Sequence, residues 1–365
     1  MKIAIIGSGN AGCAHAFKLS ESGHTVNLIK TSNSLHEENF DKIVKQEGIF
    51  GIDNTQGGQK TFQRLNLITR DIEKGLKEVD LVFVLSQSLY HPKVAKQITP
   101  FIDRNTTKVL FCVPGNLGSL FFKKELGETN IIFAEGESTP YDARIIEPGV
   151  VNILFKNVRN AVAFLPNSKR TEGMKYISQL VDSYGDFRTN IIESALHNPN
   201  LVVHTIGVIM SANRIERMKG EFWMYKESFT PSIWNLIHQL DKEKNDVIEK
   251  FSGKAISYLD ACKYRNEKDL NQDSLKVFQS YAEKGGPKGP DSLDTRYLHE
   301  DVIVGLGLLS MLGKECGVNT PVTDSLITIA SYLVNKDFHS LKRSKKDFGI
   351  DNLNFTEFKN LVNNL

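Results

Sequence analysis

The chain has 365 residues, of which 40 % are hydrophobic and 24 % charged, and its formal net charge is +2. This length suffices for two domains with sizeable cores, and the composition is typical of a globular protein. The near balance of charge argues against bulk nucleic-acid binding and against an acidic-membrane partner. No apolar run reaches the roughly 18 residues of a membrane span.

The four cysteines are scattered, without a C-x-x-C pair. This pattern favours reduced thiols over a disulfide framework, and it gives no reason to expect a metal site. We therefore expect a cytoplasmic protein that acts on small molecules and has neither nucleic-acid nor membrane partners.

The first 29 residues carry the pattern of a dinucleotide-binding unit. An apolar run at 3–6 leads into a G-x-G-x-x-G turn, a helical pattern follows, and a second apolar run covers 26–29. This is the strand–turn–helix–strand context that the glycine motif requires. The glycines permit a tight turn, close approach of a pyrophosphate and close helix packing, and the helix N-terminus offers N–H groups to the phosphates. The cofactor is expected to contact Gly7, Ser8, Gly9, Asn10, Ala11 and Gly12.

The residues after the second strand bear on the choice of cofactor. NAD-binding units usually place Asp or Glu there to hold the ribose hydroxyls, but this chain has Lys30 and Thr31, and no carboxylate appears before Glu37. A lysine flanked by hydroxyls attracts a 2′-phosphate and can donate hydrogen bonds to it. The sequence therefore favours NADP (NADPH), with NAD as the alternative cofactor. The competing interpretation is that Lys30 is a solvated surface residue.

Short apolar runs alternate with helical patterns through residue 165, as expected for strands buried on both faces of a parallel sheet. The predicted strands are 3–6, 26–29, 81–85, 109–113 and 131–133, and the runs 150–155 and 160–165 are expected to close the same sheet. Between Ser34 and Thr69 we expect only a helix and an irregular excursion. Pro114 follows one predicted strand, and loops after strand ends hold ligands in doubly wound sheets, so Pro114 joins the predicted cofactor residues.

From about residue 188 the pattern becomes helical. Asn198 and Pro199 resemble an N-cap and a first-turn proline of a helix that is expected to reach Arg217. Further helices are expected from Thr230 and over 247–262, 300–316 and 321–334. The predicted fold is an α/β Rossmann domain with a doubly wound, mostly parallel sheet (1–187), followed by an all-α substrate domain (188–365), with the substrate cleft between them.

Hydride transfer usually needs a proton donor or acceptor near the reacting carbon, and histidine suits this role because its ordinary pKa is about 6.5. His204 is the first candidate, because it lies in the first long helix of the second domain and Gly207 nearby permits close approach. The alternative is a half-buried histidine bonded to backbone, and spacing does not decide between them.

A dense polar block over 294–301 precedes a strongly apolar helical pattern at 302–312. Charged residues that enter a buried helix are costly unless they are paired or functional. Arg296 offers a planar fork for a carboxylate, and Asp301 could orient a histidine. The alternative is that the acidic residues only cap a helix, since its dipole favours them in the first turn.

With these sites in place, the chain resembles the octopine/nopaline (opine) dehydrogenase family along nearly its whole length. The shared features are the glycine turn at 7–12 and the segments 198–204, 230–232, 295–297 and 300–302. The glycine turn is common to many dehydrogenases, whereas the other segments are specific, and their order and spacing match.

Members of this family join an α-keto acid to the amino group of an amino acid and reduce the resulting imine with NAD(P)H. The resemblance implies that His204 is the catalytic histidine, Asp301 its paired aspartate, and Arg296 an arginine of the substrate region. Asn200 and Thr230 lie in matched segments and are further candidates for substrate binding. A homodimer is a candidate assembly.

Two alternatives of other kinds stay open. A simple NADPH-dependent 2-ketoacid reductase of the ketopantoate reductase type would share the domain plan and would rely on a lysine of the helical domain. A catalytically silent NADP-binding sensor would keep the glycine turn but lose the catalytic groups. The region 221–232 is a candidate wall of the substrate pocket, because three aromatic residues and a methionine cluster at 222–225, or else this cluster is part of the core.

Overall fold

The computed structural model describes residues 1–33, 35–284, 286 and 288–363. Ser34, where the expected irregular segment begins, lies outside the described residues. The chain divides into two compact units, Met1–Phe187 and Arg188–Leu365. Within the described ranges, no helix is long and apolar enough to cross a membrane.

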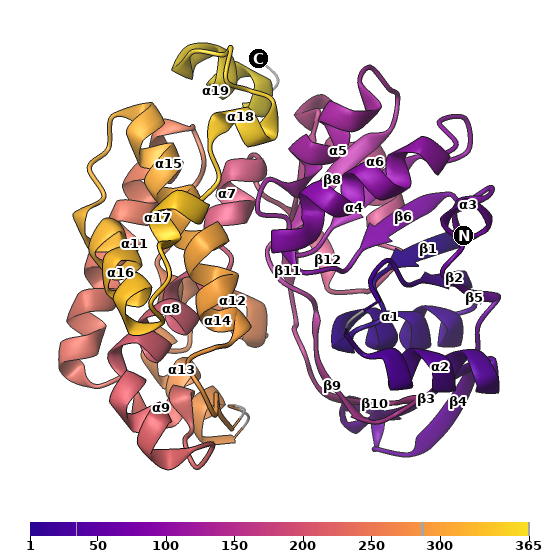
Figure 1. The fold of residues 1–365 in the computed structure, drawn as a ribbon, viewed down its shortest axis with the longest axis horizontal. Helices are drawn as coiled ribbons and strands as arrows, with labels where there is room; N and C mark the ends of the chain where they lie inside the picture. The colour runs from indigo at the N-terminus through magenta and orange to yellow at the C-terminus, as the bar shows by residue number, and fades with distance from the viewer. Residues whose placement is uncertain (34, 285, 287, 364–365) are drawn as a thin grey trace. The chain divides into compact units, whose positions relative to one another are not determined.

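The first unit is built on an eight-stranded sheet with the order β12-β11-β8-β7-β6-β1-β2-β5 (Figure 1). The six strands from β8 to β5 run parallel, whereas β11 pairs antiparallel with β8. The predicted doubly wound, mostly parallel sheet is therefore confirmed. In sheet order, the strands are β12 (Tyr184–Phe187), β11 (Asn160–Leu165), β8 (Ile132–Gly136), β7 (Val109–Cys112), β6 (Leu81–Val84), β1 (Lys2–Ile6), β2 (Thr25–Ile29) and β5 (Leu67–Thr69).

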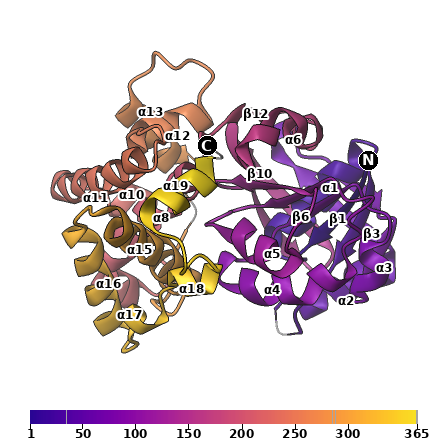
Figure 2. The ribbon, with the colours of Figure 1, turned by 90° about the horizontal axis from the view of Figure 1, so that it is seen from above.

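Helices cover both faces of this sheet. On one face, α1 and α6 contribute to a continuous apolar core with the sheet, in which Phe17, Phe83 and Phe111 are buried. On the other face, α4 and α5 pack against each other (Figure 2). The helices of the first unit are α1 (Asn10–Glu21), α2 (Glu37–Gln46), α3 (Ile72–Leu76), α4 (His91–Ile98), α5 (Gly118–Leu126) and α6 (Arg170–Ile177).

A second, four-stranded sheet corrects two expectations. The segment after α2 is not an irregular excursion, and the run 150–155 does not close the main sheet. Both pair in a sheet of order β4-β3-β10-β9. Gly51 lies against the ring of Phe17 on α1, and a Cβ there would approach that ring to 2.4 Å, so this glycine serves close packing. The strands are β4 (Lys60–Arg64), β3 (Gly48–Asp53), β10 (Val150–Lys156) and β9 (Tyr141–Glu147).

The second unit is helical, as predicted (Figure 2), and α8 packs against α11, α14, α16 and η5. Its elements are α7 (Ile191–Leu196), α8 (Asn200–Met210), α9 (Ala212–Met218), α10 (Met224–Glu227), α11 (Pro231–Lys250), α12 (Tyr258–Asn266), α13 (Ser274–Lys284), α14 (Arg296–His299), η5 (Asp301–Leu306), α15 (Gly307–Cys316), α16 (Pro321–Leu333), α17 (Phe338–Leu341), α18 (Lys345–Phe348) and α19 (Phe355–Asn363).

Several helix boundaries differ from the prediction. The helix expected to reach Arg217 breaks at Ser211, whose hydroxyl lies 2.8 Å from that of Ser228. The prediction of one helix over 247–262 is wrong, because α11 ends at Lys250 and α12 begins only at Tyr258. The helix expected over 300–316 starts as the π-helical segment η5. Single π-helical turns inside helices occur frequently at functional sites.

Candidate functional site

The glycine turn has the geometry that a dinucleotide requires. Gly7 has φ +118°, a conformation that favours glycine. A Cβ on Gly12 would lie 1.8 Å from the carbonyl oxygen of Gly7, so only glycine allows α1 to start this close to β1. A Cβ on Gly9 would meet only the ring of His36, at 3.6 Å. The turn therefore leaves its backbone open to a pyrophosphate, and the chain fits the cofactor that the motif implies.

The polar atoms of the other predicted turn residues hold the turn itself. The carbonyl oxygen of Ser8 accepts a hydrogen bond from the thiol of Cys13 at 3.3 Å. Asn10 Oδ1 accepts from the backbone N–H of Ile145 at 2.8 Å, which ties α1 to β9. The carbonyl of Ala11 accepts from His15 at 2.8 Å. The groups engaged here are all acceptors, and a phosphate would instead take donors such as the backbone N–H groups at the start of α1.

Lys30 is buried rather than solvated, so the surface interpretation of this residue is wrong. Only 4 % of it is exposed. Its Nζ donates to the carbonyl of Leu35 and to Ser32 Oγ, and lies 3.3 Å from Glu37 Oε1. Lys30 thus fastens the loop that follows β2. Thr31, the next residue, is half-buried in the same loop.

Arg70, which follows β5, completes this cluster and was missed by the sequence analysis. Its guanidinium pairs with Glu37 and donates to the Ser32 carbonyl and to Asn33 Oδ1, both at 2.9 Å. Burial alone would raise the pKa of Glu37, but hydrogen bonds from Lys30 and Arg70 hold it below its ordinary value. Two cations therefore share one carboxylate at the carboxyl end of β2.

Pro114 lies in the loop after β7, at the same edge of the parallel sheet as Gly7 and Lys30. The buried carboxylate of Glu135 organises this loop by accepting hydrogen bonds from the N–H groups of Leu117 and Ser119, at 3.0 and 2.9 Å. The predicted cofactor positions from three strands therefore occupy one edge of one sheet, where doubly wound folds bind nucleotides.

In the second unit, His204 and Asp301 are hydrogen-bonded. His204 Nδ1 lies 2.8 Å from Asp301 Oδ2, and the side chains are each 6 % exposed. A carboxylate only accepts, so Nδ1 carries the proton, and in the neutral imidazole Nε2 presents a lone pair. Asp301 is the first residue of η5, and His204 lies within α8. The helix-cap interpretation does not account for a carboxylate aimed at a histidine on another element.

Two tyrosines complete the surroundings of His204. Tyr225 Oη lies 3.2 Å from His204 Nε2, and the ring of Tyr297 meets the imidazole edge-to-face at a centroid distance of 4.2 Å. Tyr225 belongs to the cluster at 222–225, which was predicted to form either a wall of the substrate pocket or part of the core. Tyr297 stands next to Arg296 in the polar block. The sequence signal for Tyr225 was only its aromatic neighbourhood, whereas Tyr297 lies in the matched segment 295–297.

The remaining predicted substrate residues have different surroundings. The side chain of Arg296 is half-exposed, 4.0 Å from Glu300, and packs over Tyr297 at 5.8 Å. Asn200 is half-buried one turn before His204 on α8, so both lie on one helix face. Thr230 is exposed at the start of α11, and its side chain makes no capping hydrogen bond.

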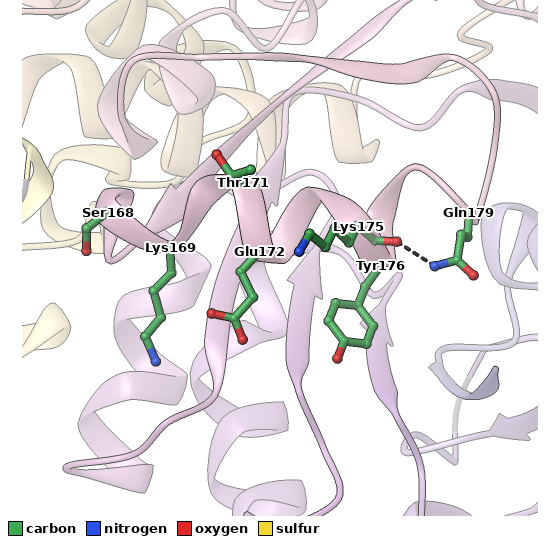
Figure 3. Close-up of a pocket in the computed structure, with 7 residues that line it drawn as sticks. All are labelled: Ser168, Lys169, Thr171, Glu172, Lys175, Tyr176 and Gln179. Carbon is green, nitrogen blue, oxygen red and sulfur yellow. Dashed lines mark hydrogen bonds between the residues drawn. The ribbon is translucent and has the colours of Figure 1, made fainter.

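A surface pocket elsewhere in the first unit contains none of the predicted residues. It lies along η4 (Asn167–Lys169) and α6, where Lys175 and Gln179 are joined by a hydrogen bond of 2.5 Å from the Gln179 amide to the Lys175 carbonyl (Figure 3). Across the described part of the chain, no group of three or more His, Cys, Asp or Glu side chains is arranged to hold a metal ion.

Comparison with known families matches both units. The family described as NAD/NADP octopine/nopaline dehydrogenase, alpha-helical domain, matches residues 187–334. The family described as ketopantoate reductase PanE/ApbA matches residues 3–153. Together with the fold, these matches define an NAD(P)-dependent oxidoreductase.

Individual relatives cover nearly the whole chain. An opine dehydrogenase of Arthrobacter sp. (strain 1C) is 26 % identical over 98 % of each chain, and a vitopine synthase of Allorhizobium ampelinum is 22 % identical over 97 % of this chain and 96 % of its own. Residues 187–334 match the octopine/nopaline dehydrogenase family and an opine dehydrogenase aligns along nearly the whole chain, so the resemblance predicted from the motifs is confirmed.

Solved structures share the fold. Octopine dehydrogenase in complex with NADH and agmatine superposes with a TM-score of 0.78 at 17 % identity, over 100 % of this chain and 98 % of its own. Yersinopine dehydrogenase with bound NADP⁺ gives 0.72 at 11 % identity, over the same shares. Relatives of this fold therefore include one solved with each nicotinamide cofactor.

Proposed function

We propose that this protein is an opine dehydrogenase that joins the amino group of an amino acid to an α-keto acid and reduces the imine with NADPH. The observation that carries the proposal is the buried His204–Asp301 hydrogen bond in the unit that matches the octopine/nopaline dehydrogenase family. The octopine dehydrogenases of similar fold have been solved with L-arginine and with pyruvate, an amino acid and an α-keto acid.

The condensation needs protons to move at one place. The amino group must lose a proton to attack the keto carbon, and the carbinolamine hydroxyl must gain one to leave as water. His204, with Nδ1 held by Asp301, moves these protons at its other nitrogen, because the carboxylate fixes the tautomer and stabilises the imidazolium that forms. Arg296 is suited to hold a substrate carboxylate, with Asn200 and Thr230 as further polar contacts.

The glycine turn and the loops after β2 and β7 would hold the nicotinamide cofactor, which when bound supplies the hydride to the imine carbon. Preference for NADPH is supported by Lys30 and Arg70, whose two positive charges are only half neutralised by the carboxylate of Glu37 that both contact. The surplus charge favours a further anion, such as a 2′-phosphate.

A second candidate function is favoured by the ketopantoate reductase match of the first unit. Such an enzyme would reduce a 2-keto acid directly, with no amine.

The two functions differ in their substrate requirement. With the purified protein, NADPH oxidation followed at 340 nm is expected only when an α-keto acid and an amino acid are both present. A panel of amino acids with pyruvate, 2-oxoglutarate and glyoxylate, with mass analysis of the product, would identify the secondary amine. An equal rate with keto acid alone would instead establish the simple reductase.

Cofactor choice is testable at Arg70. Arg70→Ala is expected to weaken NADPH binding about tenfold and to change NADH binding less than about twofold, because a charge-assisted hydrogen bond at a partly exposed site is lost. Glu37→Gln, which removes the competing carboxylate, is expected to tighten NADPH binding. Cofactor fluorescence titrations measure both.

Arg64→Ala is the matched control, because Arg64 forms an exposed pair with Glu47 on another sheet of the same unit. It should leave both affinities unchanged. Equal weakening of NADPH and NADH by Arg70→Ala would contradict the assignment of a 2′-phosphate site.

A further inference from the structure

The imidazole of His204 is enclosed by its neighbours. Asp301 occupies Nδ1 at 2.8 Å, Tyr225 Oη lies 3.2 Å from Nε2, and the Tyr297 ring contacts the imidazole at 4.2 Å. The His204 side chain is only 6 % exposed, whereas Tyr225 is half-buried. The series of hydrogen-bonding groups that begins at Asp301 therefore continues through His204 to the hydroxyl of Tyr225, a residue less buried than His204.

The fold brings Tyr225 to this position by close helix packing. Gly207 lies almost one turn after His204 on α8, and a Cβ there would approach Met224 Sδ to 2.8 Å. The missing side chain lets α10 lie directly against α8. Met224 is buried in this contact, and the next residue along α10 is Tyr225. Tyr281 meets the Tyr225 ring edge-to-face at 5.2 Å and supports it from α13.

We propose that Tyr225 is a catalytic residue, and that its hydroxyl, not the imidazole, exchanges protons with the substrate. This role rests on the condensation proposed above. A phenol hydroxyl suits it because the oxygen both donates and accepts. It can give its proton to Nε2 while taking one from the substrate, or pass a proton in the reverse direction.

The substrate ammonium gives a proton to Tyr225 Oη as the hydroxyl passes its own to Nε2, and the freed amine lone pair forms the C–N bond while the C=O π pair moves to oxygen. That proton returns from Nε2–H through Tyr225 to the alkoxide and gives the hydroxyl, while the nitrogen still carries two protons and a positive charge. The nitrogen then gives a second proton by the same route, which restores its lone pair, and this proton passes from Tyr225 to the hydroxyl as the C–O bond breaks. Water leaves with the bonding pair, and the nitrogen lone pair forms the iminium, the group that a bound nicotinamide would reduce.

Tyr225→Phe is the direct test, because it removes one oxygen and keeps the ring. The expected result is a fall in kcat of about 10²-fold or more with KM changed less than about threefold, since general acid–base groups contribute about 10²–10⁴-fold. Tyr281→Phe is the matched control and should retain wild-type kcat, because it removes one oxygen from a neighbouring tyrosine and keeps the ring that meets Tyr225 edge-to-face. Binding of NADPH and thermal unfolding should match wild type in both variants.

A graded substitution separates catalysis from mere support. Replacement of Tyr225 by 3,5-difluorotyrosine, whose phenol is more acidic, should shift the pH profile of kcat, which a structural role would not move. If Tyr225→Phe keeps kcat within about threefold, or the fluorinated variant keeps the wild-type profile, the substrate displaces Tyr225 and the inference is overturned. The proposed function is tested separately, by whether NADPH oxidation by the wild-type protein requires both the keto acid and the amino acid. Failure of the proposed function can therefore be distinguished from failure of the role of Tyr225.

Discussion

Replacing His204 with alanine is expected to lower turnover by about 10²–10⁴-fold, the usual contribution of a general acid–base group. NADPH affinity should stay near wild type, because the glycine turn belongs to the first unit and His204 to the second. Steady-state rates with both substrates and cofactor titrations of the same preparation measure the two effects.

Loss of stability would not explain such a fall. The variant leaves Asp301 buried without this hydrogen bond, which costs about 1–3 kcal/mol, whereas domains are stable by about 5–15 kcal/mol. The protein should therefore remain folded, and thermal unfolding checks this. If His204→Ala retains most of its activity, or loses cofactor binding and stability together, His204 is a packing residue.

Asp301→Asn should cost as much as His204→Ala or less, because it removes orientation and charge but keeps the imidazole. The double variant should be about as active as His204→Ala alone, since groups that act as a unit are not additive. Additive losses would indicate that the two residues act separately.

Gly12→Ala is expected to abolish high-affinity cofactor binding, with an affinity loss of at least about 100-fold because the phosphate-binding backbone must move. The added Cβ would lie 1.8 Å from the Gly7 carbonyl oxygen, a backbone atom that cannot rotate away. Overpacking of this kind costs about 1–3 kcal/mol, which corresponds to a fall in Tm of roughly 2–12 °C for a unit of this size. Calorimetric titration with NADPH and thermal unfolding measure both effects.

Gly185→Ala provides the control, because a Cβ at this position in the same unit meets nothing within 4 Å. Its cofactor affinity and Tm should equal those of wild type. Retention of NADPH binding by Gly12→Ala would show that the turn is not the phosphate site.

The features that the sequence determined by itself are local ones. The glycine spacing at 7–12 and the apolar runs at 3–6 and 81–84 specify a tight turn and doubly buried strands through residues that are near one another in the chain. The helical periodicity after residue 188 is local in the same way. Such patterns depend on the 2.0 and 3.6 residue periods, so they can be interpreted without knowing what packs against them.

Tertiary structure determines which residues come together around the site. Glu37 and Arg70 are 33 positions apart, and Tyr225 and His204 are 21 apart on different helices, so no spacing rule relates them. The His204–Asp301 pair, 97 positions apart, was expected only from a family resemblance.

The second sheet shows the same division between local pattern and tertiary contact. The apolar run of β10 was identified as a strand, but its pairing with β3, about 100 residues earlier, placed it outside the main sheet. Strand patterning records which faces of a segment are buried and does not record which partner buries them. Partner choice comes from packing between distant segments, as where Gly51 lets β3 lie against Phe17 and Gly207 lets α10 lie against α8.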